Sequence, residues 1–378
     1  IKTTMSKTTK FDDGATQFRQ RLVASILSHK PVLIRNIRAE DVENPGLKDY
    51  EASFLRLLDN MTNGSKMEIN NTGTQLRFQP GVLLGGDIQH QCPDSRSIGW
   101  FLEGIMPLAP FGKEELSIYL EGITDGCCEL DPSPDYLLKS AIPLFAKFGI
   151  GIDDDDSAVR IRVIQRAAAP TGGGKVHFQC PIVKELAPID VTDPGRIKRI
   201  RGTAISCKII STSMAARVAY AAKGVFHKLL PDVWIHTDAH TQKNHGCGPS
   251  PGLSLVVSTE STTGVTLTTE CCLNQSERGA ELPEDLGQRG ACLLLNEVQK
   301  GGCIDTSVQS LAFMWMALTP EDVSRLRIGS LSPYSIETLR LLKTFFDIEF
   351  KLTADEDSKT ILMSCVGSGY RNMAKAST

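Results

Sequence analysis

The stretch "TSVQSLAFMWMALTPEDVSRLRIGSLSPYSIETLRLLKTFFDIEFKLTADEDSKTILMSC" (residues 306–365) contains one complete structural unit. Its first part is an almost continuously apolar run, which predicts a buried helix, and its third part has apolar side chains at helical spacing. Between and after them lie short segments with strand-like patterns. The predicted elements are a helix at 306–318, a strand at 324–330, a helix at 333–346, and strands at 347–353 and 359–365.

The same order of elements occurs twice earlier in the chain, although the amino acids themselves are only weakly similar. The first unit has its elements at 14–30, 31–37, 47–61, 66–70 and 76–81, and the second at 97–111, 115–123, 134–148, 158–166 and 175–183. Each unit has an apolar sheet face that two helices can cover. We therefore predict an α/β (α+β) fold with three repeated helix–strand–helix–strand–strand units, each with two helices on a four-stranded sheet.

A different pattern separates the second and third units. A strand (197–209), a helix (213–229), a strand (232–238) and a hairpin (252–272) predict a smaller α/β domain, and a helix in 282–302 leads back to the repeats. "ELPEDLG" supplies the proline and acidic residues that are typical of a helix start. The predicted domains are a core of repeats 1 and 2 at 8–187, an inserted α/β domain at 188–284, and repeat 3 at 285–378.

The composition excludes several functional classes. The 378 residues carry a net charge of −3, so any contact with RNA requires a local basic patch. No uncharged apolar stretch of about 18 residues exists, and the N-terminus lacks the apolar segment of a signal peptide. We therefore expect no contact with a membrane. The eleven cysteines include no CxxC pair, which argues against a disulfide framework and a zinc site.

Three motifs suggest cofactors, but each is better explained by local structure. "PTGGGKVHF" (170–178) lacks the residues that a phosphate-binding P-loop requires, so a tight turn is favoured. "HTDAHTQKNHGC" (236–247) has three histidines and a cysteine, but its composition is that of an exposed loop. "GIDDDDSA" (151–158) reads as a solvated acidic turn, because four adjacent aspartates cannot all face one ion. We predict no metal and no cofactor.

Two short strands are candidates for binding a partner or RNA through basic side chains. "DPGRIKRIRG" (193–202) contains Arg196, Lys198, Arg199 and Arg201, and "SRLRIG" contains Arg325 and Arg327 on one strand face. Such residues can contact RNA phosphates or an acidic partner surface. They can equally protect an exposed sheet edge. We expect Arg327→Ala to weaken partner binding without changing thermal stability.

Taken together, the motifs resemble those of the RNA 3′-terminal phosphate cyclases. The resemblance is carried by "FDDGATQFRQRLVASILSHKPVLIRNIRA", "NPGL", "TGTQLRFQPG", "PTGGGKVHF" and the last helix with Gln309, and it covers essentially the whole chain. It implies a fold of three helix–sheet repeats with a smaller α/β domain between the second and third. That is the arrangement indicated by the pattern of elements.

The resemblance also implies a catalytic histidine that this chain lacks. In the cyclases, ATP adenylylates a histidine in a "His-Leu-Ala-Asp-Gln" segment before the last apolar helix. Aligning its glutamine with Gln309 places Asp305 at the histidine position, and all seven histidines of this chain lie at or before His245. A carboxylate would repel the α-phosphate that an imidazole attacks. We therefore predict no catalytic residue and no cyclase activity.

Other departures from the cyclase motifs point the same way. The glycine-rich "Glu-Gly-Gly-Gly-Gln-Ile-Leu-Arg" of the cyclases becomes Asp12–Arg19, in which the last Arg remains. Glu40 and Asp41 follow "IRA", where the cyclases place a second arginine. Glu51 stands at the histidine position of the cyclases' "Arg-x-x-His" motif. Such changes weaken binding of a triphosphate. The cations that remain near these motifs, Arg19, Arg38 and Lys48, are predicted to form at most a residual anion site.

The amino-acid sequences of several segments are more similar to those of a eukaryotic cyclase-like subgroup of the family. "NPGLKDYEASFLRLLD", "DPGRIKRIRG", "LPEDLG" and "LSPYSIE" carry this closer match. It implies a nucleolar assembly factor, located in the nucleus and nucleolus, that supports small ribosomal subunit biogenesis and 18S pre-rRNA processing. The implied partners are a ribosome-biogenesis GTPase, proteins of the small-subunit processome, and pre-rRNA.

Two enzymatic alternatives remain. An endonuclease acting on pre-rRNA would need converging carboxylates, for which Asp12, Asp13, Glu40, Asp41, Glu51 and Asp305 are the candidates. A surviving cyclase would need a substitute nucleophile such as Cys303, Thr306 or Ser307, and we expect no base near any of them.

Overall fold

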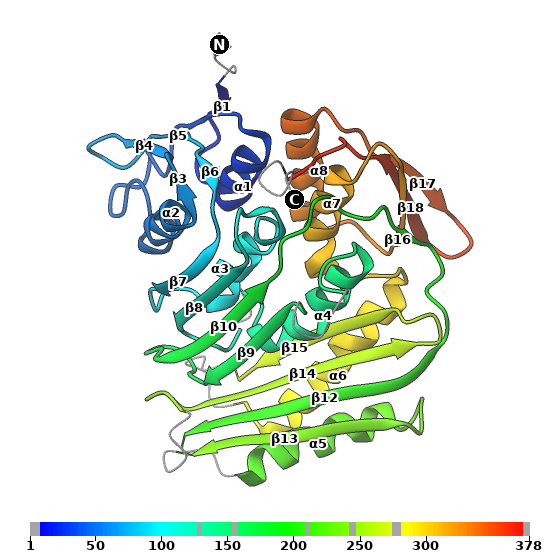
Figure 1. The fold of residues 1–378 in the computed structure, drawn as a ribbon. Helices are drawn as coiled ribbons and strands as arrows, with labels where there is room; N and C mark the ends of the chain where they lie inside the picture. Colours follow the sequence, from blue (N-terminus) through cyan, green and yellow to red (C-terminus); the bar gives the residue numbers. More distant parts are fainter. Residues whose placement is uncertain are drawn as a thin grey trace.

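The computed structural model describes residues 8–126, 131–152, 158–208, 212–241, 247–273 and 281–372. It confirms the predicted α/β class, with helices packed on mixed four-stranded sheets. Three of these sheets have the same strand order and belong to the three repeats, and a fourth belongs to the inserted segment. Figure 1 shows the repeats in the upper and middle parts of the molecule and the inserted sheet below them.

The first two repeats follow one chain path. Repeat 1 consists of β1 (Thr9–Phe11), α1 (Phe18–Ser28), β2 (Val32–Ile34), α2 (Asp49–Met61), β4 (Lys66–Ile69) and β5 (Leu76–Gln79), with β3 (Thr62–Asn63) and β6 (Val82–Leu83) paired separately. Repeat 2 consists of β7 (Gly86–Gln91), α3 (Ile98–Ile105), the 3₁₀ turn η1 (Ala109–Phe111), β8 (Leu116–Gly122), α4 (Pro134–Lys147), β9 (Arg160–Gln165) and β10 (Gly174–Cys180). The sheet orders are β1-β2-β5-β4 and β7-β8-β10-β9.

The third repeat has the same sheet order but an interrupted chain. It consists of β11 (Asp190–Val191), the 3₁₀ turn η3 (Thr306–Val308), α7 (Gln309–Leu318), β16 (Val323–Ile328), α8 (Pro333–Phe346), β17 (Lys351–Asp355) and β18 (Thr360–Val366). Its sheet order is β11-β16-β18-β17. The whole inserted segment therefore lies between the first strand of this repeat and its first helix.

Each repeat begins with a strand that the sequence pattern did not reveal. β1, β7 and β11 pair in parallel with β2, β8 and β16, and each is the edge strand of its sheet. The repeated unit is therefore strand–helix–strand–helix–strand–strand. β11 lies within the segment assigned to the inserted domain from the sequence, but it is hydrogen-bonded to the sheet of repeat 3.

The inserted segment forms its own sheet and core. It contains β12 (Ile197–Lys208), α5 (Thr212–Phe226), β13 (Val233–Thr241), β14 (Gly252–Ser261), β15 (Thr266–Cys272) and α6 (Pro283–Lys300), with sheet order β13-β12-β14-β15. α5 and α6 pack side by side on one face of this sheet. The sequence boundary at residue 284 left α6 with repeat 3, but its buried residues Leu286, Ala291 and Leu294 join the core of the insert.

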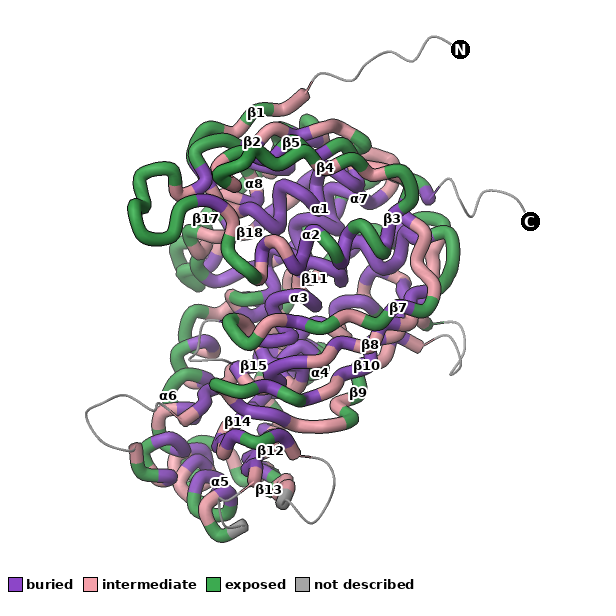
Figure 2. Tube along the Cα trace, turned by 90° about the vertical axis from the view of Figure 1, so that its left-hand side faces the viewer, coloured by how far each residue is buried: buried purple, intermediate pink, exposed green. Residues whose placement is uncertain are grey.

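One hydrophobic core unites the three repeats. Helix α7 is buried along its whole length, as expected for a helix that is apolar on all sides. Its Trp315 packs edge-on against Phe145 and Phe148 of repeat 2, with ring centroids 4.5 and 5.4 Å apart. Figure 2 shows that the buried segments along α1, α3 and α7 gather in the middle of the repeat region. The repeats thus hold one another in place and fix the surfaces between them.

Candidate functional site

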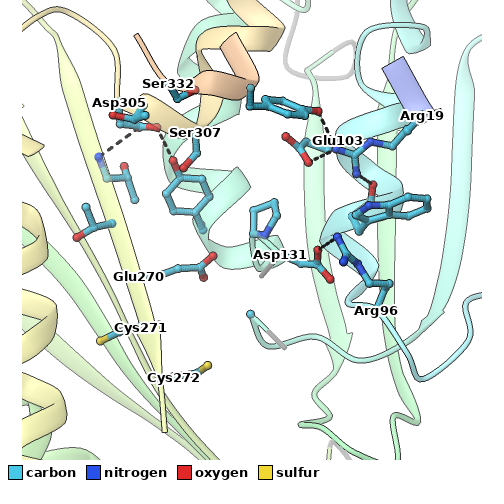
Figure 3. A pocket seen from close by; sticks show the side chains of 18 of the residues that line it. Arg19, Arg96, Glu103, Asp131, Glu270, Cys271, Cys272, Asp305, Ser307 and Ser332 are labelled. Atoms are coloured by element: carbon cyan, nitrogen blue, oxygen red, sulfur yellow. Dashed lines mark hydrogen bonds and ion pairs between the residues drawn. The ribbon is translucent and has the colours of Figure 1, made fainter. Parts of the chain in front are cut away.

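A cavity of about 820 Å³ lies where repeats 1 and 2 face the inserted domain. One wall comes from α1, α2 and α3, and the opposite wall from β15, α6 and the loop that leads into α7 (Figure 3). Volumes of this size are typical of sites for small ligands. The cavity is lined by residues of the N-terminal cyclase-like motif, such as Arg19, and of the segment before the last apolar helix, such as Asp305. It is therefore the candidate functional site.

Asp305 lies in the wall of this cavity opposite Arg19 and Arg96, at the turn before η3 and α7 (Figure 3). Its side chain is only 2% exposed. The Tyr136 hydroxyl donates to Oδ1, while Ser140 Oγ at 2.5 Å and the Thr268 backbone N–H at 3.3 Å donate to Oδ2. The carboxylate at the expected histidine position is therefore fully engaged in hydrogen bonds.

Burial raises the pKa of Asp305 to about 6, and the hydrogen bonds from Ser140 and Tyr136 oppose that shift. Near pH 7 the group is therefore mostly ionised. A carboxylate with both oxygens occupied can neither attack a phosphate nor accept a proton from a substrate without breaking this network. The local geometry favours a structural role.

Thr306 corrects one expectation about substitute nucleophiles. We expected no base near this residue, but its hydroxyl donates to Glu297 at 2.6 Å. The same carboxylate accepts the Thr306 backbone N–H at 2.6 Å and pairs with Lys300 at 2.7 Å. Of the other two candidates, Cys303 is 1% exposed and burial raises the pKa of its thiol to about 11, while Ser307 lines the cavity. The Glu297 contacts fix the turn after Asp305, and its carboxylate is already engaged by Thr306 and Lys300.

Arg19, the retained motif arginine, lines the cavity but is held by the protein itself. It forms an ion pair with Glu103 and donates to the Trp100 carbonyl and, at 3.1 Å, to the Tyr334 hydroxyl. Its guanidinium also lies 4.8 Å from the centre of the Trp100 ring. An incoming phosphate would have to compete with the half-buried Glu103 carboxylate that is already paired with this arginine.

The other predicted anion-site cations are divided between cavity and surface. Arg38 lines the cavity and donates to both carboxylate oxygens of Glu51, at 2.8 and 2.6 Å. Lys48 is exposed just before α2 and is not among the cavity residues. The structure therefore brings Arg19 and Arg38 to one cavity, each with its own carboxylate, and leaves Lys48 outside.

Arg96 and Glu270 belong to the cavity as well, although the sequence analysis did not select them. Arg96 pairs with Asp131 at 2.7 Å, and Glu270 accepts the Ser133 backbone N–H at 2.7 Å. Burial raises the pKa of Glu270 to about 8. Both residues lie outside the motifs that resemble the cyclases, so no sequence pattern points to them. They are recognised as cavity residues because the fold places them around the same cavity.

Residues 197–201 form the first part of β12, which β14 separates from the cavity-lining strand β15 (Figure 1). Arg196 and Lys198 are exposed, whereas Arg199 pairs with Glu260 at 2.5 Å and Arg201 with Asp232 at 2.8 Å. A register shift between Ile197 and Arg199 places Lys198 in a bulge. Part of the positive charge of this strand is therefore neutralised by neighbouring strands.

Arg325 and Arg327 lie on one face of β16, as their spacing predicted. Arg325 is exposed and makes only a 3.5 Å pair with Asp190. Arg327 is more enclosed: it donates to the Thr192 carbonyl at 2.7 Å and pairs with Asp355 at 2.7 Å. It also donates to Ser358 at 3.3 Å and to Thr360 at 2.8 Å. The two arginines differ in how much of the guanidinium remains available to a partner.

The carboxylates proposed for an endonuclease do not gather in the cavity. Only Glu51 and Asp305 of the six candidates line it, and Glu51 is paired with Arg38. Within the described ranges, no group of three His, Cys, Asp or Glu side chains has a geometry that could hold a metal ion. His245 of the histidine-rich loop and all four aspartates of the acidic turn lie outside the described residues.

The triple-glycine segment adopts the tight turn that was favoured from its sequence. Gly172 and Gly173 have φ of 53° and 85°, a left-handed region that other residues rarely occupy. A Cβ at Gly172 would lie 2.2 Å from the Asp94 carboxylate. Close packing therefore accounts for this motif. Among the described helices, none combines the length and apolar character needed to cross a bilayer.

Comparison with known proteins agrees with the motif resemblance. The chain matches the RNA 3′-terminal phosphate cyclase family over residues 11–352. It is 48% identical over 369 residues to the RNA 3′-terminal phosphate cyclase-like protein of Homo sapiens, covering 96% of both chains. A probable cyclase-like protein of Dictyostelium discoideum is 46% identical over 375 residues, covering 96% of this chain and 98% of the relative.

A third relative has a name that refers to a process. The rRNA processing protein rcl1 of Schizosaccharomyces pombe is 38% identical to this chain over 364 residues, covering 95% of this chain and 96% of the relative. Relatives of this kind, named cyclase-like, confirm the closer resemblance to the eukaryotic subgroup. The chain has the expected three repeats and an inserted domain, and the family model and the relatives match nearly its whole length. It belongs to the RNA 3′-terminal phosphate cyclase family.

Proposed function

We propose that this protein has lost cyclase activity and acts in rRNA processing as a nucleolar assembly factor for the small ribosomal subunit. In this role it binds a ribosome-biogenesis GTPase and proteins of the small-subunit processome, and it supports maturation of 18S pre-rRNA. The similarity to cyclase-like proteins, one of them named an rRNA processing protein, supports the process. The partners and the location follow from the subgroup resemblance.

The observation that carries the loss of cyclase activity is the environment of Asp305. The position where the resemblance requires a nucleophilic histidine holds a buried carboxylate with hydrogen bonds to Tyr136, Ser140 and the Thr268 backbone. Adenylylation needs a neutral nucleophile that can approach the α-phosphate. Arg19 and Arg38, which could neutralise phosphate charge, are already paired with Glu103 and Glu51.

The first test is an adenylylation assay with α-labelled ATP and Mg²⁺, run beside an active cyclase. We expect the control to be labelled and this protein to remain unlabelled. Phosphate-ended RNA should likewise keep its 3′-phosphate. A covalent label that maps to Thr306 or another cavity residue would overturn the loss of activity, because a substitute nucleophile would then be at work.

The second test addresses the process and its partners. Depletion of the protein in its own cells should reduce 18S rRNA and accumulate its precursors, and the wild-type chain should restore processing. The tagged protein should locate to the nucleolus and co-purify with a GTPase. Normal 18S rRNA after depletion would contradict the proposed role.

A third measurement separates the assembly role from cleavage. The purified protein is incubated with Mg²⁺ and precursor RNA, and we expect no site-specific cut, in keeping with the dispersed carboxylates. A cut that is lost in Asp305→Asn would favour an endonuclease instead.

A further inference from the structure

The charges that line the cavity do not suit a phosphate ligand. Four cations and six carboxylates contribute to its lining. Each cation has a carboxylate partner: Arg19 with Glu103, Arg38 with Glu51, Arg96 with Asp131, and Lys300 with Glu297. Two carboxyl groups, Glu270 and Asp305, remain without a cation among the described residues. The cavity therefore has an excess of negative charge.

Of these two carboxyl groups, only Glu270 faces the open space. Asp305 is saturated by hydroxyl and N–H donors, whereas Glu270 extends from β15 into the cavity (Figure 3). Its main partner is Ser133, at the N-terminus of α4, where the helix dipole favours negative charge. Asp125 and Asp135 are the nearby charges, and both oppose ionisation of Glu270. Among the residues that the structure describes, Glu270 has no positively charged partner.

A second cavity residue also has unused hydrogen-bonding capacity. Thr268 lies two residues before Glu270 on the same face of β15 and is 1% exposed. Its buried hydroxyl has no hydrogen-bond partner among the described residues. Buried polar groups are normally satisfied, so an orphan hydroxyl beside an unpaired carboxyl indicates space for a polar ligand.

The opposite wall provides aromatic surfaces that suit a cation. Tyr50 and Trp100 line the cavity, and the Arg96 guanidinium already lies 5.2 Å and 5.6 Å from the centres of their rings. Aromatic faces attract guanidinium and ammonium groups through the ring quadrupole. Arg19 and Arg96 of the chain already lie over these rings, so this wall shows that the cavity accommodates guanidinium groups, and the Glu270 carboxyl on the other wall is what favours a positively charged ligand.

We propose that the cavity binds an arginine or lysine side chain from a basic peptide segment of a protein partner, with Glu270 as the counter-ion. This proposal rests on the proposed assembly role, because it assigns a partner to the cavity that no longer carries out cyclisation. An anionic nucleotide is disfavoured because it would meet the carboxylates of Glu297 and Asp305 on one wall. On the other wall it would have to displace the carboxylates bound to Arg19 and Arg38.

Binding of a cation should release a proton from the protein. The pKa of Glu270 is raised to about 8 mainly by burial, with Asp125 and Asp135 adding to the rise, so the group is mostly protonated near pH 7. A guanidinium beside it favours the ionised form. Affinity should therefore increase as the pH rises from about 6 to about 9, and on the order of one proton should leave per bound peptide near pH 7.

The test is isothermal titration calorimetry of the full chain with an end-blocked Arg-Arg-Arg peptide in two buffers of different protonation enthalpy. We expect Glu270→Gln to weaken binding by about tenfold or more and to abolish proton release. Glu270→Asp, which keeps the charge, should retain part of both. The matched control is Glu121→Gln on the exposed face of β8, outside the cavity lining, which should bind the peptide like the wild type. Thermal melts establish that each variant is folded.

Four results would overturn the proposal. The first is peptide affinity that does not change in Glu270→Gln, and the second is an equal loss in Glu121→Gln, which would indicate non-specific attraction. The third is Glu270-dependent binding of spermidine without binding of the peptide, because the ligand would then be a polyamine. The fourth is tighter binding of Mg·ATP than of the peptide. None of these results bears on the 18S rRNA phenotype, so the proposed function stands or falls separately.

Discussion

At Asp305 a single side chain occupies the position at which the family resemblance expects the nucleophile, and the pairing of two arginines in the same cavity acts in the same direction. Restoring the family residue by Asp305→His should not restore adenylylation, because Arg19 and Arg38 stay paired with carboxylates. The variant should also be less stable by about 2–4 kcal/mol, since Tyr136 and Ser140 lose their buried acceptor. Labelling with α-labelled ATP and urea unfolding measure the two effects. Appearance of a label in this variant would show that the histidine alone was missing.

The raised pKa of Glu270 predicts how the stability of the protein depends on pH. Its pKa is about 8 in the folded protein, against an unfolded value near 4.5, so the folded state holds the proton more tightly. Stability should therefore be full at low pH and should fall as the pH rises through 8. Asp305, with a pKa raised to about 6, contributes a decline of the same sign at lower pH.

Glu270→Gln should remove the upper part of that decline. The melting temperature of the variant should exceed that of the wild type by roughly a few degrees at about pH 8, with the difference shrinking toward about pH 5. Differential scanning calorimetry across this range measures it. Parallel curves for the two proteins would contradict the raised pKa.

At the scale of elements, β16 illustrates how two arginines on one strand face can have different roles. Arg327 bonds to Thr192, Asp355 and Thr360, and so joins β16 to the segment after β11 and to the β17–β18 hairpin. Because of these contacts, we no longer expect Arg327→Ala to leave the stability unchanged. The free energy of unfolding of the variant should fall by about 1–3 kcal/mol. In Arg325→Ala the free energy of unfolding should fall by only about 0–0.5 kcal/mol, because the ion pair of Arg325 with Asp190 is exposed.

Urea unfolding of both variants measures these losses, and partner pull-down completes the comparison. If β16 is a docking surface, Arg325→Ala should weaken partner binding while leaving the midpoint of unfolding in place. Equal stability of the two variants would show that the Arg327 contacts contribute little.

The same scale explains which elements could be predicted. The long helices and the β14–β15 hairpin have clear periodicity, and their positions agree with the sequence pattern. β1 and β11 were missed because three-residue and two-residue strands have no measurable periodicity. β7, "GDIQHQ", has only one buried residue, so it lacked the apolar signal of a strand. Pairing with a parallel neighbour, which no local pattern records, makes these segments strands.

At the scale of the molecule, Arg166 connects the inserted domain to the repeats. It follows β9, makes two bonds to Asp135 of α4 at 2.6 and 3.0 Å, and also donates to Asp238 and His240 of β13 at 3.1 and 3.2 Å. Burial of this guanidinium between the two parts makes the pairing costly to break. The orientation of the inserted sheet, and with it the width of the cavity, depends partly on this residue.

Arg166→Met should loosen the insert relative to the repeats at a cost of about 2 kcal/mol, because Asp135 and Asp238 would lose their shared cation. Hydrogen exchange followed by mass spectrometry should show faster exchange in β13, with α7 unaffected. Arg162→Met on the exposed face of β9 is the matched control. Unchanged exchange in β13 would mean that the remaining contacts suffice.

The amino-acid order by itself determined the number of repeats, the presence of an insertion and the family, because helical and strand periodicities and the order of motifs are local properties of the chain. It also predicts, through the resemblance, that Asp305 stands at the position of the histidine. The tertiary structure alone decided which groups meet in the cavity: Glu103 and Asp131 have no local signature and become important only beside Arg19 and Arg96, and Glu270 only where it reaches Ser133 at the start of α4. Burial and charge pairing depend on contacts between distant segments, and these in turn decide the pKa of Glu270 and the chemistry that the cavity can accept.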